Sequence, residues 1–505
     1  MSIKLPRSAG GWGAIRYSLK MADRAGGLWP MLKALASRNN CKSCALGMGG
    51  QKSGMTNEVG KFPEICNESI QAQLTDLQQE IPLELFRTGY VLQSPRQRIT
   101  GYLNCNTIAR LKAKLFLLLF FGIICLFSCQ KPGLPLPPTA ANSRYPNVTE
   151  TDRGLAIVWF EPVQEGHALK WSEFTGRMWS NPVIITSGKD YFINWADFPS
   201  VFYNGNSHFV VHWLEKNGSG PYDYDVKVVQ SHDRGRSWSA PIMPHRDEKK
   251  GEHGFVSFFK VNDNEIGLVW LDGRNMLAEG HEVGYGQMTL YATTLDKDGG
   301  LGKEILLDDR VCECCPTSAI EIGNEILVAY RDRSLSEIRN INLVRWDGGA
   351  WKKPQPLHDD NWKIAGCPVN GPKLAVQGNN VASVWYTSPH EQSSIYISIS
   401  NDGGDNFNAP VRLDSGKPIG RVDCIWLDRD RVLVSWMEMG AESTNVMFST
   451  VSSAGQKSRS MIATQISPGR ASGHPVISRY RQHIFLAWTE VGEVDEIRSK
   501  WIQVN

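Results

Sequence analysis

Arginine residues follow several hydrophobic runs in the second half of the chain, and they are the side chains best suited to hold an anionic substrate. Arg274, Arg331 and Arg333 come shortly after two of these runs, and Arg421 is a fourth candidate. A guanidinium group is planar and permanently charged, and its paired N–H groups match the two oxygens of a carboxylate. These arginines are therefore candidates for a carboxylate clamp. The alternative is that each arginine forms a salt bridge with a neighbouring carboxylate.

Cysteine and histidine residues form a second set, whose chemistry suits soft metal ions or disulfides. The segment 311–316 reads VCECCP, and the segment 366–372 reads GCPVNGP. The candidate ligands are Cys312, Cys314, Cys315, Cys367, His253 and His474. Thiolate and imidazole groups suit copper(I) or zinc, so a copper or zinc site is one prediction. In an exported protein such thiols are often oxidised, and a Cys315–Cys367 or Cys314–Cys367 disulfide is the alternative.

Both sets are positioned by a repeat that covers the last three-quarters of the chain. Seven hydrophobic runs, each typical of a β-strand, contain an aromatic residue near their end, and successive aromatics are 51 to 60 residues apart. They are Trp159, Trp213, Trp270, Tyr330, Trp385, Trp436 and Trp488. A period of this size, with several short strands per unit, is typical of a β-propeller. We therefore predict an all-β fold over residues 145–505, a six- or seven-bladed β-propeller. Seven repeats favour seven blades, with an early strand near Tyr145 closing the ring.

The propeller geometry predicts that both sets of residues lie on one face. The loops that join second to third strands emerge on the same side as the segments that lead into each innermost strand. The first set follows the repeat aromatics and includes Asp272 and Glu438. The second set lies 12 to 18 residues before the aromatics and also includes Asp197 and Asp423. Because each loop on this face supplies a polar or reactive group, we expect a binding site there.

Two turns carry a motif that resembles a known family. Residues 231–238 read SHDRGRSW and residues 400–407 read SNDGGDNF, and both fit the pattern S-x-D-x-G-x-x-(W/F). The aspartate can accept backbone N–H groups inside the turn, the glycine permits a positive φ, and the aromatic packs back between strands. The motif resembles the Asp-box, or BNR repeat, of sialidase-like propellers. In sialidases these turns lie on the face opposite the active site, so the motif indicates the fold rather than the chemistry.

The resemblance to sialidases implies roles for particular residues. Sialidases hold the substrate carboxylate with three arginines and use a tyrosine, paired with a glutamate, as the nucleophile. The implied catalytic residues are Arg274, Arg331 and Arg333 as the clamp, Tyr386 as the nucleophile, Glu438 as its base and Asp272 as the acid. Glu490 is the alternative base and Asp197 the alternative acid. The R-I-P motif that carries the first sialidase arginine is absent from the opening repeat.

The sequence thus predicts a propeller that acts on or binds glycans, either as an exo-α-sialidase-type glycoside hydrolase or as a non-catalytic module for a glycan or protein. Loss of Tyr386 would abolish turnover in the first case and leave binding intact in the second. A copper- or zinc-binding propeller is a further alternative. The formal net charge of +2 gives no reason to expect nucleic acid as a partner. We expect a monomer.

A segment in the middle of the first half resembles a lipoprotein signal. Residues 111–129 place two lysines before an apolar stretch that ends in Cys129, and a proline-rich linker follows over residues 130–144. The stretch is shorter than a membrane span and suits the hydrophobic region of a secretory signal. Its end resembles the lipobox of bacterial lipoproteins, in which the cysteine is lipidated. We therefore predict lipidation at Cys129 and a location in the bacterial cell envelope, anchored to a membrane and periplasmic or surface-exposed.

The first 110 residues differ in composition from the rest of the chain and show no strand repeat. Residues 9–14 read AGGWGA, and residues 41–44 read CKSC. Over residues 8–86 the segment resembles the N-terminus of formate-dehydrogenase-like molybdopterin oxidoreductases, without the catalytic body of that family. Two thiolates do not complete an iron–sulfur site. We predict a truncated remnant without activity, and a natural start at Leu111 is one explanation.

Overall fold

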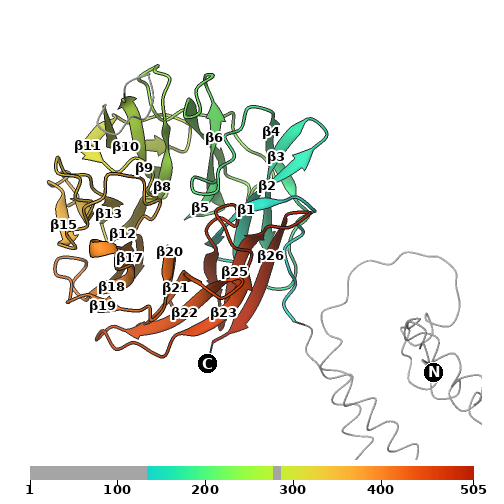
Figure 1. Ribbon diagram of the computed structural model, residues 1–505. Coiled ribbons are helices and arrows are strands. Elements are labelled where there is room, and N and C mark those ends of the chain that lie inside the picture. Colours follow the sequence, from blue (N-terminus) through green and yellow to red (C-terminus); the bar gives the residue numbers. More distant parts are fainter. Residues whose placement is uncertain (1–132, 277–285, 505) are drawn as a thin grey trace, which may run out of the picture. The chain divides into compact units, whose positions relative to one another are not determined.

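The computed structural model describes residues 133–276 and 286–504, which form an all-β, seven-bladed propeller (Figure 1). Seven antiparallel sheets are arranged around a ring, and the chain passes through the sheets in order. Five sheets have four strands and two have three. The predicted fold class is confirmed, and the number of blades is seven rather than six.

The strands follow one another regularly within each blade. Blade 1 contains β1 (Arg144–Glu150), β2 (Leu155–Val163), β3 (Gly166–Phe174) and β4 (Val183–Gly188). Blade 2 contains β5 (Ser200–Gly205), β6 (His208–Lys216) and β7 (Tyr224–Ser231). Blade 3 contains β8 (His253–Asn262), β9 (Glu265–Asn275), β10 (Gln287–Asp296) and β11 (Ile305–Val311). Blade 4 contains β12 (Ser318–Ile322), β13 (Glu325–Arg331), β14 (Ile341–Trp346) and β15 (Gln355–His358).

The remaining blades repeat this order. Blade 5 contains β16 (Lys373–Gln377), β17 (Asn380–Thr387), β18 (Ser394–Ser400) and β19 (Val411–Arg412). Blade 6 contains β20 (Pro418–Trp426), β21 (Arg431–Met439), β22 (Thr444–Ser452) and β23 (Met461–Ile466). Blade 7 contains β24 (Val476–Tyr480), β25 (His483–Glu490) and β26 (Glu496–Gln503). Within the described ranges no helix is long and apolar enough to cross a membrane.

The recurring aromatic of each repeat lies on the second strand of its blade and is buried. In five blades the indole Nε1 donates a hydrogen bond to a carboxylate two residues further on, at 2.7 to 3.3 Å. The acceptors are Glu161, Glu215, Asp272, Glu438 and Glu490. In blades 4 and 5 the aromatic donates instead to Asp308 or Asp360, from the end of the preceding blade. The pairing satisfies a buried polar N–H or O–H group, so the aromatic-acid pattern of the sequence has a structural cause.

Innermost strands of neighbouring blades belong to separate sheets, so side chains satisfy some of their backbone N–H groups. Asn147 Oδ1 on β1 accepts a hydrogen bond from the Val201 N–H group on β5 at 3.0 Å. Asp423 Oδ2 on β20 accepts one from the Ile477 N–H group on β24 at 2.9 Å. These contacts join successive blades around the central channel.

The Asp-box turns lie on the rim opposite the loops that join second to third strands, because each box follows the end of a third strand. In the first box Ser231 Oγ accepts the Gly235 N–H group at 2.7 Å, and Asp233 Oδ1 accepts the Ser237 N–H group at 2.9 Å. Gly235 has a φ of +73°, which a side chain would disfavour. The turn at residues 400–407 repeats this pattern.

Packing and hydrogen bonds close the ring between blades 7 and 1, because no strand is shared between them. The early strand near Tyr145 is β1, the innermost strand of blade 1, and it lies beside β24 and β25. The segment before β1 crosses the junction. The Pro135 carbonyl accepts one hydrogen bond from Trp179 Nε1 of the first repeat at 3.0 Å and another from Trp501 Nε1 on β26 at 2.9 Å.

Candidate functional site

A cavity of about 360 Å³ opens on the face that carries the loops between second and third strands. Two kinds of segment line it, as the propeller geometry requires. Glu252 and Cys367 belong to segments that lead into innermost strands. Tyr224 is the first residue of the third strand β7, and Arg333 belongs to a loop between a second and a third strand. Trp195 adds an aromatic surface to the wall. A concave site with aromatic walls and a few polar groups is typical of small-molecule binding.

The chemical centre of the cavity is a tyrosine–glutamate pair. The Tyr224 hydroxyl group donates a hydrogen bond to Glu252 Oε1 at 2.7 Å. The two residues also form a parallel backbone bridge between blades 2 and 3, and the Tyr224 ring stacks on Phe192 with ring centroids 4.0 Å apart. Burial raises the pKa of Glu252 to about 7, although the hydrogen bond from Tyr224 acts in the opposite direction. A carboxylate with a pKa near neutrality suits a general base.

Asp197 provides a second carboxyl group beside this pair. Its Oδ2 atom accepts a hydrogen bond from the Phe255 N–H group at 2.9 Å. A Cβ atom added to Gly254 would lie 2.0 Å from this oxygen and 3.1 Å from a ring carbon of Tyr224, so glycine permits the close approach. Burial raises the pKa of Asp197 well above its usual range, and the charge of Glu252 raises it further while the Phe255 hydrogen bond lowers it. The raised pKa favours the protonated form of the Asp197 carboxyl group, which is the form that can donate a proton.

The opposite wall of the cavity carries arginines that already have partners. Arg333 pairs with Glu313 and with Glu337, the latter at 2.7 Å. Arg339 pairs with the same two carboxylates at 2.7 and 3.0 Å. The exposed Arg470 also lines the cavity, and within the described ranges its guanidinium group makes no ion pair or hydrogen bond. Arg470 is therefore a cation that can meet an anionic ligand.

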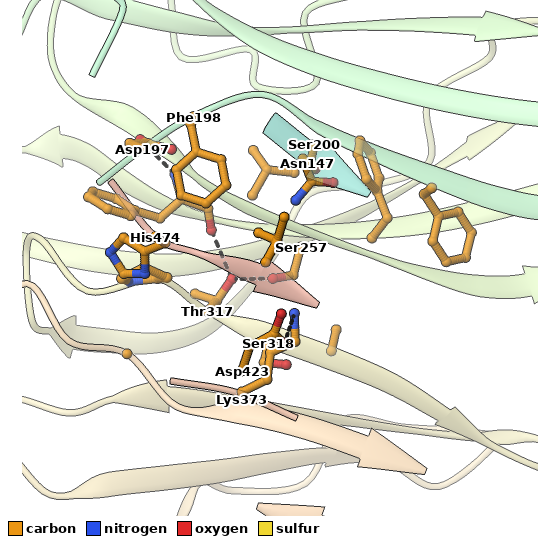
Figure 2. A pocket seen from close by; sticks show the side chains of 18 of the residues that line it. Asn147, Asp197, Phe198, Ser200, Ser257, Thr317, Ser318, Lys373, Asp423 and His474 are labelled. Atoms are coloured by element: carbon orange, nitrogen blue, oxygen red, sulfur yellow. Dashed lines mark hydrogen bonds and ion pairs between the residues drawn. The ribbon is translucent and has the colours of Figure 1, made fainter. Parts of the chain in front are cut away.

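A second cavity of about 290 Å³ lies among the innermost strands (Figure 2). Asp197 lines both cavities. Lys373 pairs with Asp423 at 3.3 Å, and His474 stacks on Trp195 with ring centroids 6.1 Å apart. Burial, together with neighbouring cationic charges, lowers the pKa of His474 to about 3, so the ring is neutral at physiological pH. Asp197 is the titratable group that the two cavities share.

The structure places the predicted clamp arginines in separate environments. Arg274 pairs with Asp272 at 2.6 Å and with Glu304 at 3.2 Å. Arg331 is buried and donates to three backbone carbonyl groups at 2.6 to 2.9 Å. Of the three, only Arg333 lines the cavity. Arg274 and Arg333 therefore form salt bridges, which was the alternative prediction for these arginines.

Arg421, the fourth candidate, also binds backbone rather than facing a carboxylate. It donates to the Gly473 carbonyl at 2.6 Å and to Ser472 Oγ at 3.2 Å, and its guanidinium carbon lies 4.6 Å from the centre of the Trp195 ring. Burial lowers the pKa of Arg421 to about 10, and the charge of Arg470 acts in the same direction. The residue stabilises the junction of blades 6 and 7.

The other residues implied by the sialidase resemblance have partners outside the cavity. The Tyr386 hydroxyl group lies 2.7 Å from Ser393 Oγ. Glu438 accepts the Trp436 indole hydrogen bond at 2.8 Å, and Asp272 is held by an indole and by an arginine. Tyr386, Glu438 and Asp272 are not among the residues that line the cavity. Tyr224 and Glu252 form another tyrosine–glutamate pair, which does line the cavity, and the roles expected of Tyr386, Glu438 and Asp272 stay predictions.

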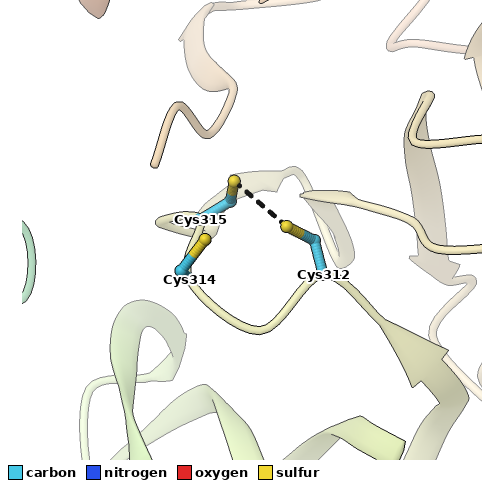
Figure 3. Close-up of side chains that lie close together, drawn as sticks. All are labelled: Cys312, Cys314 and Cys315. Carbon is cyan, nitrogen blue, oxygen red and sulfur yellow. Dashed lines mark hydrogen bonds between the residues drawn. The ribbon is translucent and has the colours of Figure 1, made fainter. Parts of the chain in front are cut away.

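The three cysteines of the VCECCP segment lie together (Figure 3), and Cys314 is the one that lines the cavity. The Sγ atoms of Cys312 and Cys315 are 3.3 Å apart, and all three Sγ atoms lie within 4.8 Å of one another. Burial raises the pKa of Cys312, but hydrogen bonds from Cys314 and Cys315 and the charge of Arg339 together lower it well below its usual range. Arg339 Nη1 lies 3.0 Å from Cys312 Sγ. Its charge stabilises a thiolate and opposes a metal cation at that sulfur.

The six predicted metal ligands divide among three places. Cys367 lies near Cys314 and lines the same cavity. His253 belongs to a separate cluster with His245, and His474 lies in the channel. The five described cysteines are free thiols, and the copper or zinc expected at them stays a prediction.

Sequence reasoning missed the groups that contribute most to the cavity. Tyr224 opens a third strand, where the repeat has no recurring motif, and Glu252 immediately precedes His253, which the repeat spacing did select. Arg339 and Arg470 lie in loops of irregular length. The lipidation predicted at Cys129, the signal segment 111–129 and the segment 1–110 lie outside the described residues.

Comparison with known proteins assigns the chain to a family. The model of the BNR repeat-like domain matches residues 154–456, and the chain belongs to this family. The match agrees with the predicted sialidase-like repeat, and it does not extend to residues 8–86, whose predicted resemblance to molybdopterin oxidoreductases has no support. A search of curated protein sequences found no match.

Several solved structures are similar to the propeller. A protein of unknown function from Dyadobacter fermentans is 14% identical, with 72% of this chain and 95% of that chain covered and a TM-score of 0.43. A Hadza microbial sialidase is 11% identical, with 70% and 74% covered and a TM-score of 0.43. An α-L-arabinofuranosidase from Fusarium graminearum is 12% identical, with 72% and 93% covered and a TM-score of 0.41. The fold assignment itself rests on the strand pairing described above.

Proposed function

We propose that the protein is a glycoside hydrolase that cleaves a terminal sugar bound in the cavity of about 360 Å³. The observation that carries this proposal is the hydrogen bond between Tyr224 and Glu252, with the Asp197 carboxyl group beside it. The Tyr224 oxygen would attack the anomeric carbon while its proton passes to Glu252. The bond to the leaving oxygen would break as Asp197 donates its proton. A water molecule, deprotonated by Asp197, would then cleave the tyrosyl–sugar bond, and Glu252 would return the proton to Tyr224.

The cavity favours a sugar that carries a carboxylate. The Arg470 side chain faces the cavity without an ion pair in the described part of the chain, whereas Arg333 and Arg339 are neutralised by glutamates. A neutral tyrosine is also a better nucleophile than a carboxylate toward an anionic substrate. The membership of the BNR repeat-like family is consistent with such a substrate. We therefore place sialosides first among the substrates to test.

The test compares two tyrosines that lie on the same face. The purified full chain would be incubated with fluorogenic aryl sialosides and with neutral aryl glycosides, and release of the aryl group would be measured. We expect turnover of the sialoside, and a fall in kcat of at least about 100-fold in both Tyr224→Phe and Glu252→Gln. The matched control is Tyr386→Phe, which removes the same hydroxyl group outside the cavity and should keep kcat.

The contrary outcomes are distinct. A loss of turnover in Tyr386→Phe with normal activity in Tyr224→Phe would move the site to blade 5. An absence of turnover combined with binding of acidic glycans that Arg470→Gln abolishes would replace hydrolysis with recognition. An absence of both turnover and glycan binding would overturn the proposal.

A further inference from the structure

We propose that His245, His253 and Asp225 form a zinc site behind the Tyr224–Glu252 pair. Asp225 is the second residue of β7 and His253 is the first residue of β8, so the ion would join blade 2 to blade 3. The three candidate ligand atoms lie within 4.8 Å of one another. The inference does not rest on the proposed function, because metal binding can be measured without a substrate.

The two imidazole rings are arranged as a parallel pair. Their centroids are 3.8 Å apart and their planes differ by 2°. Asp247 spans one edge of the pair, with its carboxylate oxygens 3.2 Å from His245 Nδ1 and 3.3 Å from His253 Nε2. A carboxylate that accepts the N–H group of a histidine fixes its tautomer and leaves the other ring nitrogen as a metal ligand. Asp247 thus leaves His245 Nε2 and His253 Nδ1 as the candidate ligand atoms, of which His253 Nδ1 also lies 3.3 Å from the carbonyl oxygens of Tyr224 and Gly251.

Asp225 lies close to both candidate nitrogens. Asp225 Oδ1 lies 3.6 Å from His245 Nε2 and 4.0 Å from His253 Nδ1. In a tetrahedral zinc site the ligand atoms lie about 2.1 Å from the ion and hence about 3.4 Å from one another. The two separations from Asp225 are wider than this value, and the parallel rings would have to tilt so that both nitrogens point at the ion.

The buried side chain of His245 provides a second, independent observation that points to a bound ligand. Its side chain is 2% exposed, and its Nε2 atom has no hydrogen-bond partner among the described residues. An unpaired polar atom in a buried position costs free energy unless something binds it. Around His253 Nδ1 the carbonyl oxygens of Tyr224 and Gly251 lie 3.3 Å away, where one of them can complete the coordination.

The other carboxylate near His253 is a poorer ligand. Asp272 lies 3.7 Å from His253 Nε2, but Arg274 and the Trp270 indole already bind both of its oxygens. Asp225 has weaker charged contacts, because Lys227 lies 3.6 Å from its Oδ2 atom and its Oδ1 atom accepts a hydrogen bond from the neutral Asn217 amide at 2.5 Å. Two imidazoles with one carboxylate form a ligand set that suits zinc.

The experiment measures zinc in the full chain and separates this site from the cysteines. After chelation and dialysis, zinc would be added back and bound metal counted by mass spectrometry, with affinity measured by competition against a chromophoric chelator. We expect one zinc ion per chain and an increase in Tm on loading. His245→Gln should weaken zinc binding at least about 100-fold, and Cys314→Ser should leave this affinity unchanged.

Two further variants keep the test decisive if His245→Gln does not fold. Asp225→Asn removes the third ligand and should weaken binding similarly, whereas Asp247→Asn keeps the ligands and should weaken binding by about 10- to 100-fold. Zinc bound equally by all the histidine and aspartate variants and lost in Cys314→Ser would overturn the proposal. A wild-type chain that binds no zinc at micromolar concentration would overturn it as well.

Discussion

The two sides of the cavity present different kinds of group. On the side of blades 2 and 3 the wall carries Asp197, Tyr224 and Glu252, which are titratable groups. On the side of blades 4 and 5 the prominent charged groups are Arg333 and Arg339, which keep their charge and are already paired with glutamates. The first side has carboxyl and phenol groups whose pKa values are raised mainly by burial. The second side is organised by permanent charge.

This difference separates groups that can react from groups that hold the wall in place. An arginine does not release a proton in a protein, so it binds or orients but does not act as a base. A buried carboxyl group beside a phenol can pass protons in both directions near neutral pH. The comparison predicts that changes on the two sides will affect different measured quantities.

The largest effect on stability is expected from Arg331→Leu, on the side of blades 4 and 5. Leucine cannot donate to the three carbonyl groups that Arg331 binds, and each would remain buried without a partner. We expect the free energy of unfolding to fall by about 3–5 kcal/mol, measured by chemical denaturation. The control is Arg470→Leu, whose exposed side chain makes no ion pair in the described ranges and should change stability by less than about 0.5 kcal/mol. Equal losses in both variants would show that the carbonyl contacts of Arg331 contribute no more to stability than an exposed arginine does.

A smaller, pH-dependent effect is expected on the side of blade 2. Burial lowers the pKa of His212 to about 3, below the value of about 6.5 in an unfolded chain. The unfolded state therefore binds a proton that the folded state excludes, and stability present above pH of about 6.5 is lost as the pH falls toward 3. Between pH 7 and pH 5 the wild-type chain should lose about 2 kcal/mol more than His212→Asn, measured by urea unfolding at both pH values. The same loss in both proteins would contradict the neutral, buried histidine.

The smallest effect is expected from Glu438→Gln in blade 6, which lies outside both walls. The glutamine amide oxygen can still accept the Trp436 hydrogen bond that Glu438 accepts at 2.8 Å. We expect the free energy of unfolding to fall by about 0.5–1.5 kcal/mol and any turnover to be unchanged. A strong loss of turnover with a normal denaturation curve would assign Glu438 to the chemistry and extend the reactive side around the ring.

The periodic features of the sequence predicted the fold because each repeat must bury an aromatic residue and provide a hydrogen-bond acceptor for its polar group. Trp159 and Trp436 occupy equivalent positions on second strands, and each needs an acceptor for its indole N–H group. The site depends on how single side chains point from loops of unequal length. Arg331 lies on the predicted face, but its guanidinium group turns inward to backbone carbonyls that no sequence pattern specifies. Tyr224 and Glu252 belong to different blades, so their contact depends on how blades 2 and 3 pack against each other.

The contacts of Pro135 at the junction of blades 7 and 1 have a mechanical consequence. Its carbonyl group is held by Trp179 from the first repeat and by Trp501 from the last blade. Tension that enters the propeller along the chain at this point is divided between the two ends of the ring before it reaches β1. A force applied there would act on the first and the last blade at the same time. We therefore expect the propeller to resist opening between these two blades.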